Sequence, residues 1–173
     1  MKRIFLIVTI FGFYLCAPAF AENGKAMIHG TAEGSPISGA ATIEDTGEGF
    51  VKLHILLSGL STGKHGFHIH EFGSCEDEGK AAGGHYNPEG VQHGDVLKDG
   101  FMKAHAGDFG NIEVGPDGNA DMTVTMQGLS LSGGKRSIAG RSIIIHEKED
   151  DFGQPTGNAG GRVGCGVIII NNQ

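Results

Sequence analysis

The stretch "VKLHI", residues 51–55, alternates apolar and polar side chains, so Val51, Leu53 and Ile55 share one face of an extended strand. Four further runs read as strands: residues 26–31, 122–126, 142–146 and 167–170. Helix-period patterns are nearly absent from the chain after its first residues, and 31 glycines and several turn signals separate the runs. This pattern predicts an all-β sandwich or barrel that forms one domain.

Two segments do not fit the strand pattern, residues 71–110 and residues 147–164. Both are rich in glycine, charged residues and turn formers. The first is about 40 residues long, and loops of that length in a compact domain are usually functional or disordered. The residues that these segments contain decide between the two outcomes.

Histidines gather in and beside the two segments. Six of the 9 histidines lie there: His68, His70, His85, His93, His105 and His146. His68 and His70 are two positions apart on a strand and therefore share a face, and Asp108 follows His105 by three. Imidazole and carboxylate groups are the ligands of zinc, copper and iron centres. Seven candidates exceed one tetrahedral site, so we expect two ions that share one ligand.

The remaining histidines have simpler interpretations. His29 and His54 lie on strand faces opposite the apolar ones, which predicts two surface side chains. His65 adjoins the pair at His68 and His70, and we expect it to pack beside the site rather than to bind an ion.

The first 21 residues have the features of a secretory signal peptide. Lys2 and Arg3 begin the chain, residues 4–15 are apolar but too short to span a bilayer easily, and Ala19-Phe20-Ala21 is a cleavage signal. We therefore predict a signal peptide at residues 1–21 and a mature domain at residues 22–173. A lipid anchor on Cys16 is the alternative, but it normally requires small residues before the cysteine.

Cleavage would leave 152 residues and take the net charge from −7 to −9. An acidic chain of this kind argues against nucleic acid or an anionic membrane surface as a partner, and we expect no membrane anchor after cleavage. Cys75 and Cys165 are then the remaining cysteines, and an even pair in an exported protein predicts one disulfide.

Several long stretches, in the same order, resemble the copper/zinc superoxide dismutase family along nearly the whole mature chain. They are "GKHGFHIHEFG" (63–73), "GGHYNP" (83–88), "HAGDFGNI" (105–112), "SIAGRSIIIHEKEDDFG" (137–153) and "NAGGRVGCGVI" (158–168). The resemblance implies an eight-stranded Greek-key β-barrel or sandwich with two long functional loops. It also implies one copper and one zinc ion per subunit and no organic cofactor.

The resemblance also assigns roles to single residues. Copper would be bound by His68, His70, His85 and His146. Zinc would be bound by His85, His93, His105 and Asp108, so that His85 bridges the two ions and takes part in catalysis. Asp150 matches a carboxylate that orients ligands of both ions. Arg162 matches the arginine that guides superoxide to the copper.

The chain departs from the animal cytosolic members of the family in three places. Cys75 follows His70 by five residues, as in bacterial periplasmic members, which predicts the periplasm, with secretion as the alternative. The loop between His93 and His105 is longer than usual. The stretch between Asp150 and Arg162 is short and lacks the charged residues that help attract substrate in animal enzymes.

The expected reaction is the dismutation of superoxide to oxygen and hydrogen peroxide. A metal-binding module on the same barrel is one alternative, and an adhesion domain that has lost the chemistry is another. Arg162 favours the enzyme over the first, and the complete ligand set argues against the second. The oligomeric state stays open, with a homodimer as one possibility.

Overall fold

The computed structural model describes residues 22–171 of the 173-residue chain. The predicted signal peptide at residues 1–21, with Cys16, lies outside the described residues. Within residues 22–171, no helix is long and apolar enough to cross a membrane.

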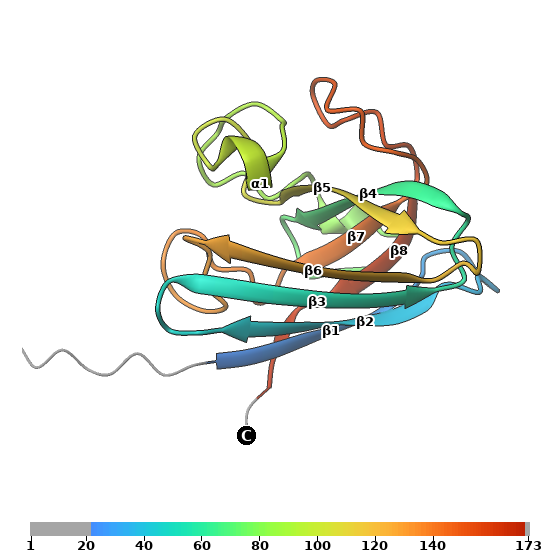
Figure 1. The fold of residues 1–173 in the computed structure, drawn as a ribbon, viewed down its shortest axis with the longest axis horizontal. Helices are drawn as coiled ribbons and strands as arrows, with labels where there is room; N and C mark the ends of the chain where they lie inside the picture. The colour runs from blue at the N-terminus through green and yellow to red at the C-terminus, as the bar shows by residue number, and fades with distance from the viewer. Residues whose placement is uncertain (1–21, 172–173) are drawn as a thin grey trace, which may run out of the picture.

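The described chain is built almost entirely of antiparallel strands (Figure 1). They are β1 (Glu22–Gly30), β2 (Ser38–Asp45), β3 (Phe50–Ser58), β4 (Gly63–His70), β5 (Asp108–Val114), β6 (Ala120–Gln127), β7 (Ser142–His146), β8 (Arg162–Val167) and β9 (Ile169–Ile170). The sheet order is β5-β4-β7-β8-β1-β2-β3-β6, and β9 pairs with β1. The helices are α1 (Val96–Asp99) and a 3-10 turn at Lys80–Ala82.

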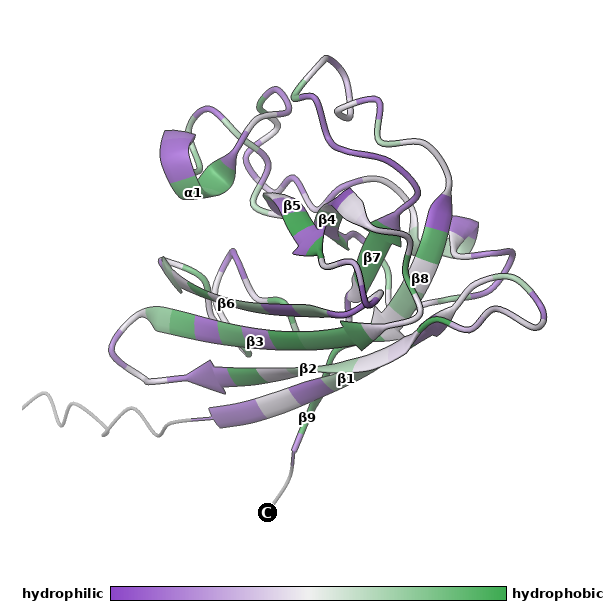
Figure 2. Cartoon of the chain, turned by 45° about the vertical axis from the view of Figure 1, so that its right-hand side comes forward, coloured by the Kyte–Doolittle hydropathy of each residue, from purple (hydrophilic) through white to green (hydrophobic). Residues whose placement is uncertain are grey.

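The sheet curls around an apolar core, as the predicted alternation requires. In β3, Val51, Leu53, Ile55 and Leu57 are buried while the side chains between them face outward. Figure 2 shows the same alternation along β3 and a continuous apolar stretch along β7. Burying such side chains contributes about 1.5 to 3 kcal/mol each. The predicted all-β barrel is therefore confirmed, as are the strands expected at residues 51–55, 122–126 and 142–146.

The two predicted loops are shorter than expected. β5 begins at Asp108, inside the predicted 71–110 segment, and β8 begins at Arg162, inside the predicted 147–164 segment. The first residues of β5 are buried in an unbroken run, and β8 contains two glycines, so neither shows an alternating pattern. The loops that remain project from the same side of the sheet, above β4, β5 and β7 (Figure 1).

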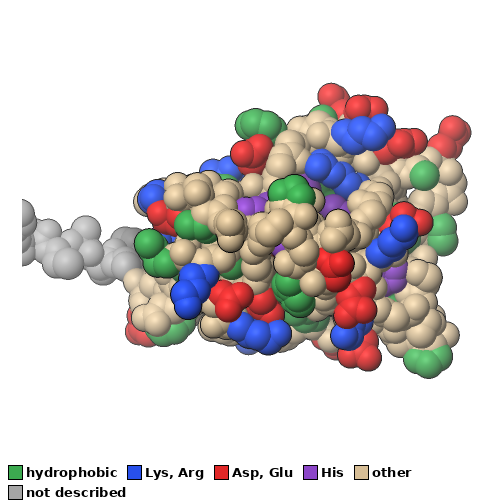
Figure 3. All heavy atoms as spheres, turned by 90° about the horizontal axis from the view of Figure 1, so that it is seen from above, with side chains coloured by type: hydrophobic (Ala, Val, Ile, Leu, Met, Phe, Trp, Pro, Cys, Tyr) green, Lys and Arg blue, Asp and Glu red, His purple; other side chains and the backbone are tan. Residues whose placement is uncertain are grey.

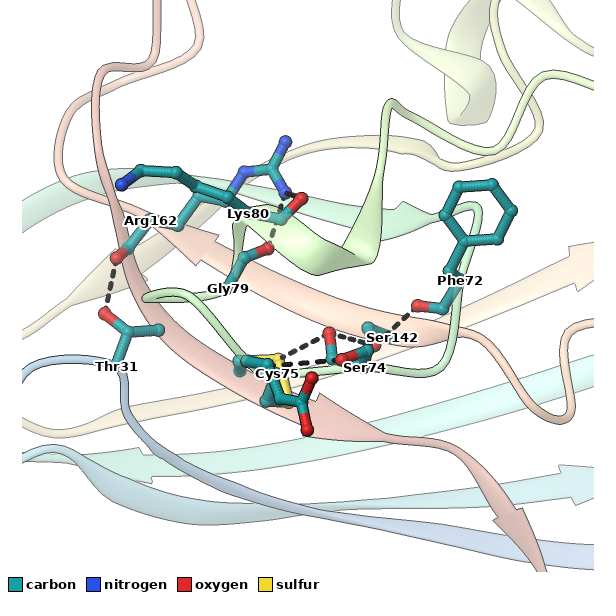
Figure 4. Close-up of a disulfide and its surroundings, with 10 residues drawn as sticks. Thr31, Phe72, Ser74, Cys75, Gly79, Lys80, Ser142 and Arg162 are labelled. Atoms are coloured by element: carbon teal, nitrogen blue, oxygen red, sulfur yellow. Dashed lines mark hydrogen bonds between the residues drawn. A yellow bond between two sulfur atoms is a disulfide. The ribbon is translucent and has the colours of Figure 1, made fainter.

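The disulfide predicted between Cys75 and Cys165 is present, with Cα atoms 5.7 Å apart (Figure 4). It ties the segment after β4 to the middle of β8. The same loop segment therefore cannot move away from β8 without breaking a covalent bond.

Candidate metal centre

The structure brings all seven predicted ligands together in two groups that share His85. The first group is His68, His70, His85 and His146, and the second is His85, His93, His105 and Asp108. In each group the candidate ligand atoms lie within 4.8 Å of one another, and every member is buried. The strands supply His68, His70, Asp108 and His146, whereas the long loop supplies His85, His93 and His105.

Hydrogen bonds of the first group leave one ring nitrogen free on each of three histidines. His70 donates from Nδ1 to the carbonyl of Gly83 at 3.0 Å, and His146 donates from Nδ1 to that of Gly160 at 3.3 Å. Their Nε2 atoms then face each other at 3.4 Å. His68 Nε2 is hydrogen-bonded to Asp150 Oδ2 at 2.7 Å. The buried Nδ1 of His68 has no hydrogen-bond partner among the described residues.

The carboxylate of Asp108 is the centre of the second group. Its oxygens lie 2.7 Å from His85 Nδ1 and 3.1 Å from His105 Nδ1. His93 Nδ1 lies 2.8 Å from Asp108 Oδ2, but the angles of this contact do not make it a hydrogen bond. Burial opposes ionisation of Asp108, but the surrounding histidines outweigh it and hold its pKa well below its usual range.

Asp150 joins the two groups. Its Oδ2 lies 2.7 Å from His68 Nε2, and its Oδ1 lies 3.0 Å from His93 Nε2. The side chain is 1% exposed, and burial opposes its ionisation, but these histidines hold its pKa well below normal. Burial would also lower the pKa of His93, but the carboxylates of Asp108 and Asp150 outweigh burial and raise it to about 9.

The donor set fits two metal ions. Two nitrogens bound at about 2.0 to 2.1 Å to one ion lie about 2.9 Å apart at right angles and about 4.1 Å apart when opposite, and the 3.4 Å between His70 and His146 Nε2 falls within this range. The unpartnered buried nitrogens of His68 and His93 gain a partner if an ion is bound. Burial lowers the pKa of His70 to about 2, of His146 to about 3 and of His85 to about 4, so these rings are neutral and ready to bind at neutral pH.

Arg162 lies beside the first group, at the start of β8 (Figure 4). Its Nη1 donates to the carbonyl of Gly79 and its Nη2 to that of Gly83, both at 2.6 Å. The Gly83 carbonyl is also the acceptor for His70 Nδ1, so one peptide group positions both side chains. Burial lowers the pKa of Arg162 from its ordinary value, and the group stays charged at neutral pH.

Four lysines are candidates to support Arg162, namely Lys64, Lys80, Lys98 and Lys103, and the first three are paired with acidic residues. Lys64 contacts Glu149 at 2.8 Å, Lys98 contacts Asp95 at 2.6 Å, and Lys80 lies 3.7 Å from acidic neighbours in its own turn. Figure 3 shows this side of the molecule, where histidine side chains are visible among lysine, arginine and acidic residues. The charges of these three lysines are therefore balanced by neighbouring acids.

The other histidines are placed as expected. His65 is buried and donates from Nδ1 to the carbonyl of His146 at 2.8 Å, so it packs beside the site. His29 is exposed, and His54 pairs with Asp121 at 2.9 Å on the outer side of β3. Sequence reasoning missed the carbonyls of Gly83 and Gly160, because backbone acceptors leave no mark in a sequence.

A family model described as copper/zinc superoxide dismutase matches residues 37–168. The chain belongs to the copper/zinc superoxide dismutase family. An Extracellular superoxide dismutase (Cu-Zn) from Caenorhabditis elegans is 41% identical over 94% of this chain and 76% of its own length. Another of that name from Drosophila melanogaster is 44% identical over 75% of this chain and 72% of its own length. Like its family, the chain is an oxidoreductase that uses copper and zinc to dismute superoxide.

Acidification is expected to destabilise the metal-free protein between pH 6.5 and 4. The ordinary histidine pKa is 6.5, whereas burial lowers the pKa of His85 to about 4 and that of His146 to about 3. As the pH falls below 6.5, these histidines take up protons in the unfolded state before they do so in the folded state. The free energy of unfolding therefore falls on acidification, by up to about 1.4 kcal/mol per pH unit for each histidine.

His93 affects stability in a different pH range, because its pKa is raised to about 9. The stabilisation that protonated His93 provides is present below pH 6.5 and is lost as the pH rises from 6.5 to 9. Denaturant unfolding of the metal-free protein over this pH series measures both effects. A free energy of unfolding that does not change between pH 6.5 and 4 would contradict the prediction.

Proposed function

We propose that copper is bound by the first group and zinc by the second, with His85 shared between them. Copper cycles between two oxidation states and supplies the redox chemistry, whereas zinc has none. The observation that carries the assignment is the position of His85. Its Nδ1 lies against Asp108, which leaves Nε2 for the side of His68, His70 and His146.

The side chains of the site would hold a proton and orient the ligands during the reaction. His85 can hold a proton at Nε2 when that nitrogen is free, because its Nδ1 side stays fixed by the Asp108 group. Dismutation converts two superoxide ions and two protons into one oxygen and one hydrogen peroxide molecule. Asp150 orients His68 and His93 through their Nε2 atoms, so their Nδ1 atoms would be available to bind the ions.

A superoxide turnover assay of the protein loaded with copper and zinc, combined with metal analysis, tests the function. We expect rapid turnover and about one ion of each metal per chain. Bound metal without turnover would indicate a metal-binding module instead. Failure to bind either metal in a well-folded protein would indicate a domain that has lost the chemistry.

We also propose that Arg162 attracts and orients superoxide. The two carbonyls of Gly79 and Gly83 hold the guanidinium beside the copper ligands, and the candidate lysines Lys64 and Lys98 are paired with acids. The net charge, −7 for the full chain and −9 once Lys2 and Arg3 are removed with the signal peptide, repels an anion at long range, so a local positive group has a large effect on capture.

Arg162→Ala is expected to lower the second-order rate about tenfold and Arg162→Glu about 100-fold at low salt. The wild-type rate should fall as salt rises, and the alanine variant should respond less, because less attraction remains to be screened. Stopped-flow measurement on metal-loaded protein checks both. Lys25→Glu, which makes the same charge change on the exposed face of β1, should stay within about twofold. Wild-type rates for Arg162→Glu would assign the guiding role to another residue.

We propose export for this chain, with cleavage after Ala21 and a mature domain at residues 22–173. The spacing of Cys75 after His70 favours the periplasm, and the two relatives are named as extracellular enzymes. N-terminal sequencing of the mature protein and fractionation of the producing cells test cleavage and compartment. A mature protein that retains residues 1–21 in a membrane fraction would contradict this proposal.

We propose a homodimer as the assembled state. Phe72 and Ile169 are apolar and 59% and 50% exposed, and burial of such side chains in an interface is favourable. Sedimentation at micromolar concentration tests this, and a purely monomeric protein would contradict it.

A further inference from the structure

The short loop of residues 151–161 closes over the metal centre with few connections to the long loop of residues 71–107. Most of its hydrogen bonds are internal or return to β7 and the residues that follow it, such as Gly157 to Gly153 at 2.7 Å and Lys148 to Ala159 at 2.8 Å. Between residues 151–161 and 71–107, both of which are fully described, the hydrogen bonds all come from one side chain, that of Gln154.

The carboxamide of Gln154 binds both polar groups of one backbone residue. Its Oε1 accepts a hydrogen bond from the backbone N–H of His93 at 3.2 Å, and its Nε2 donates to the carbonyl of His93 at 2.8 Å. The amide thus holds the His93 backbone at both its N–H and its carbonyl, which restrains its position more than a single hydrogen bond would. His93 is buried, so both backbone groups would otherwise need other partners.

Asp150, which immediately precedes the short loop, and Phe152 within it both contact the His93 side chain. Asp150 lies 3.0 Å from its Nε2, and the ring of Phe152 is stacked on the imidazole, with a centroid distance of 6.4 Å and an interplanar angle of 19°. Phe152 has a φ of 60°, which is unusual for a residue with a side chain. The hydrogen bonds and the ring stacking described above therefore converge on His93, while the Phe152 ring also lies 5.6 Å from Lys98 Nζ.

The absence of a side chain at Gly157 allows the loop backbone to pack against Asp150 and His93. A Cβ atom at this position would lie 1.8 Å from Asp150 Oδ1 and 2.7 Å from His93 Nε2. The backbone φ of 78° also favours glycine. The loop is thus packed directly on the hydrogen bond between Asp150 and His93.

We propose that Gln154 is a positioning residue that latches the short loop onto His93 and thereby slows the release of zinc. The inference rests on the proposed binding of zinc by His93. The free Nδ1 of His93 is directed at the zinc group, and its orientation depends on the backbone that Gln154 holds. Because the Gln154 side chain hydrogen-bonds, among the described residues, only to His93, which belongs to the zinc group alone, copper bound by His68, His70, His85 and His146 should be little affected.

The test measures zinc and copper release from the loaded protein separately, with a chromogenic chelator for each ion. Gln154→Ala should release zinc about tenfold faster, the range found when a partner of a metal ligand is lost. Gln154→Glu should also speed zinc release, because a carboxylate can accept from the His93 N–H but cannot donate to its carbonyl. Gln127→Ala, which removes an exposed glutamine from β6, is the matched control and should stay within about twofold.

Copper release should stay within about twofold in all three variants, and this distinguishes a latch on His93 from a general loss of structure. Zinc release at the wild-type rate in Gln154→Ala and Gln154→Glu would overturn the inference, as would an equal acceleration of copper release. His93→Ala is measured in parallel. If His93→Ala retained zinc as tightly as the wild type, His93 would not be a zinc ligand, and the proposed role of Gln154 would be wrong as well.

Discussion

Replacing His85 by alanine is expected to reduce both copper and zinc binding and to lower superoxide turnover at least about 100-fold. His85 belongs to both ligand groups, and its two ring nitrogens face different groups. Loss of the ring leaves three candidate ligands in each group and removes the one side chain that would be shared by both ions. It also removes the proton carrier at Nε2. Metal analysis and stopped-flow turnover of the reconstituted variant measure these effects.

His93→Ala separates the two sites, because His93 belongs to the second group alone. It should lower zinc content strongly and copper content little. His54→Ala is the control for loss of an imidazole, since His54 lies on the outer side of β3 and pairs with Asp121. Equal loss of both ions in His93→Ala, or full metal content in His85→Ala, would contradict the shared ligand.

Cys75→Ser should produce the largest loss of stability. The bond to Cys165 closes a sequence separation of 90 residues, and the chain-entropy argument gives at most about 4 to 5 kcal/mol for such a loop. For a domain of this size that corresponds to a fall of roughly 10 °C in melting temperature. Calorimetry of the metal-loaded variant measures the shift.

The same substitution should slow turnover, because the disulfide anchors the segment that positions Arg162. Gly79 and Gly83, whose carbonyls accept from that arginine, follow Cys75 in one loop (Figure 4). Cys165→Ser should have a similar effect, and the double variant should cost little more than either single one. Two free thiols in the oxidised, exported protein, or unchanged stability and turnover in Cys75→Ser, would contradict this account.

The sequence alone was enough to predict the fold class and the residue types at the site. Alternation in β3 and β6 is a local property of the chain, because a strand that is half buried must place apolar residues at every second position, and the continuous apolar run of β7 is equally local. The spacing of His68 and His70, and of His105 and Asp108, is local in the same sense. The resemblance to the family then implied the ligand set, and the even number of cysteines left after signal cleavage predicted the disulfide.

Only the tertiary structure decided how these side chains act on one another. Asp150 is one acid within the run "EKEDD" until the fold brings it within 3.0 Å of two histidines. The ring nitrogen that each histidine leaves free depends on carbonyls such as those of Gly83 and Gly160. The latch of Gln154 on His93 joins positions 61 residues apart. Sequence patterns record local periodicity and residue chemistry, whereas hydrogen bonds across loops depend on where the whole barrel places each peptide group.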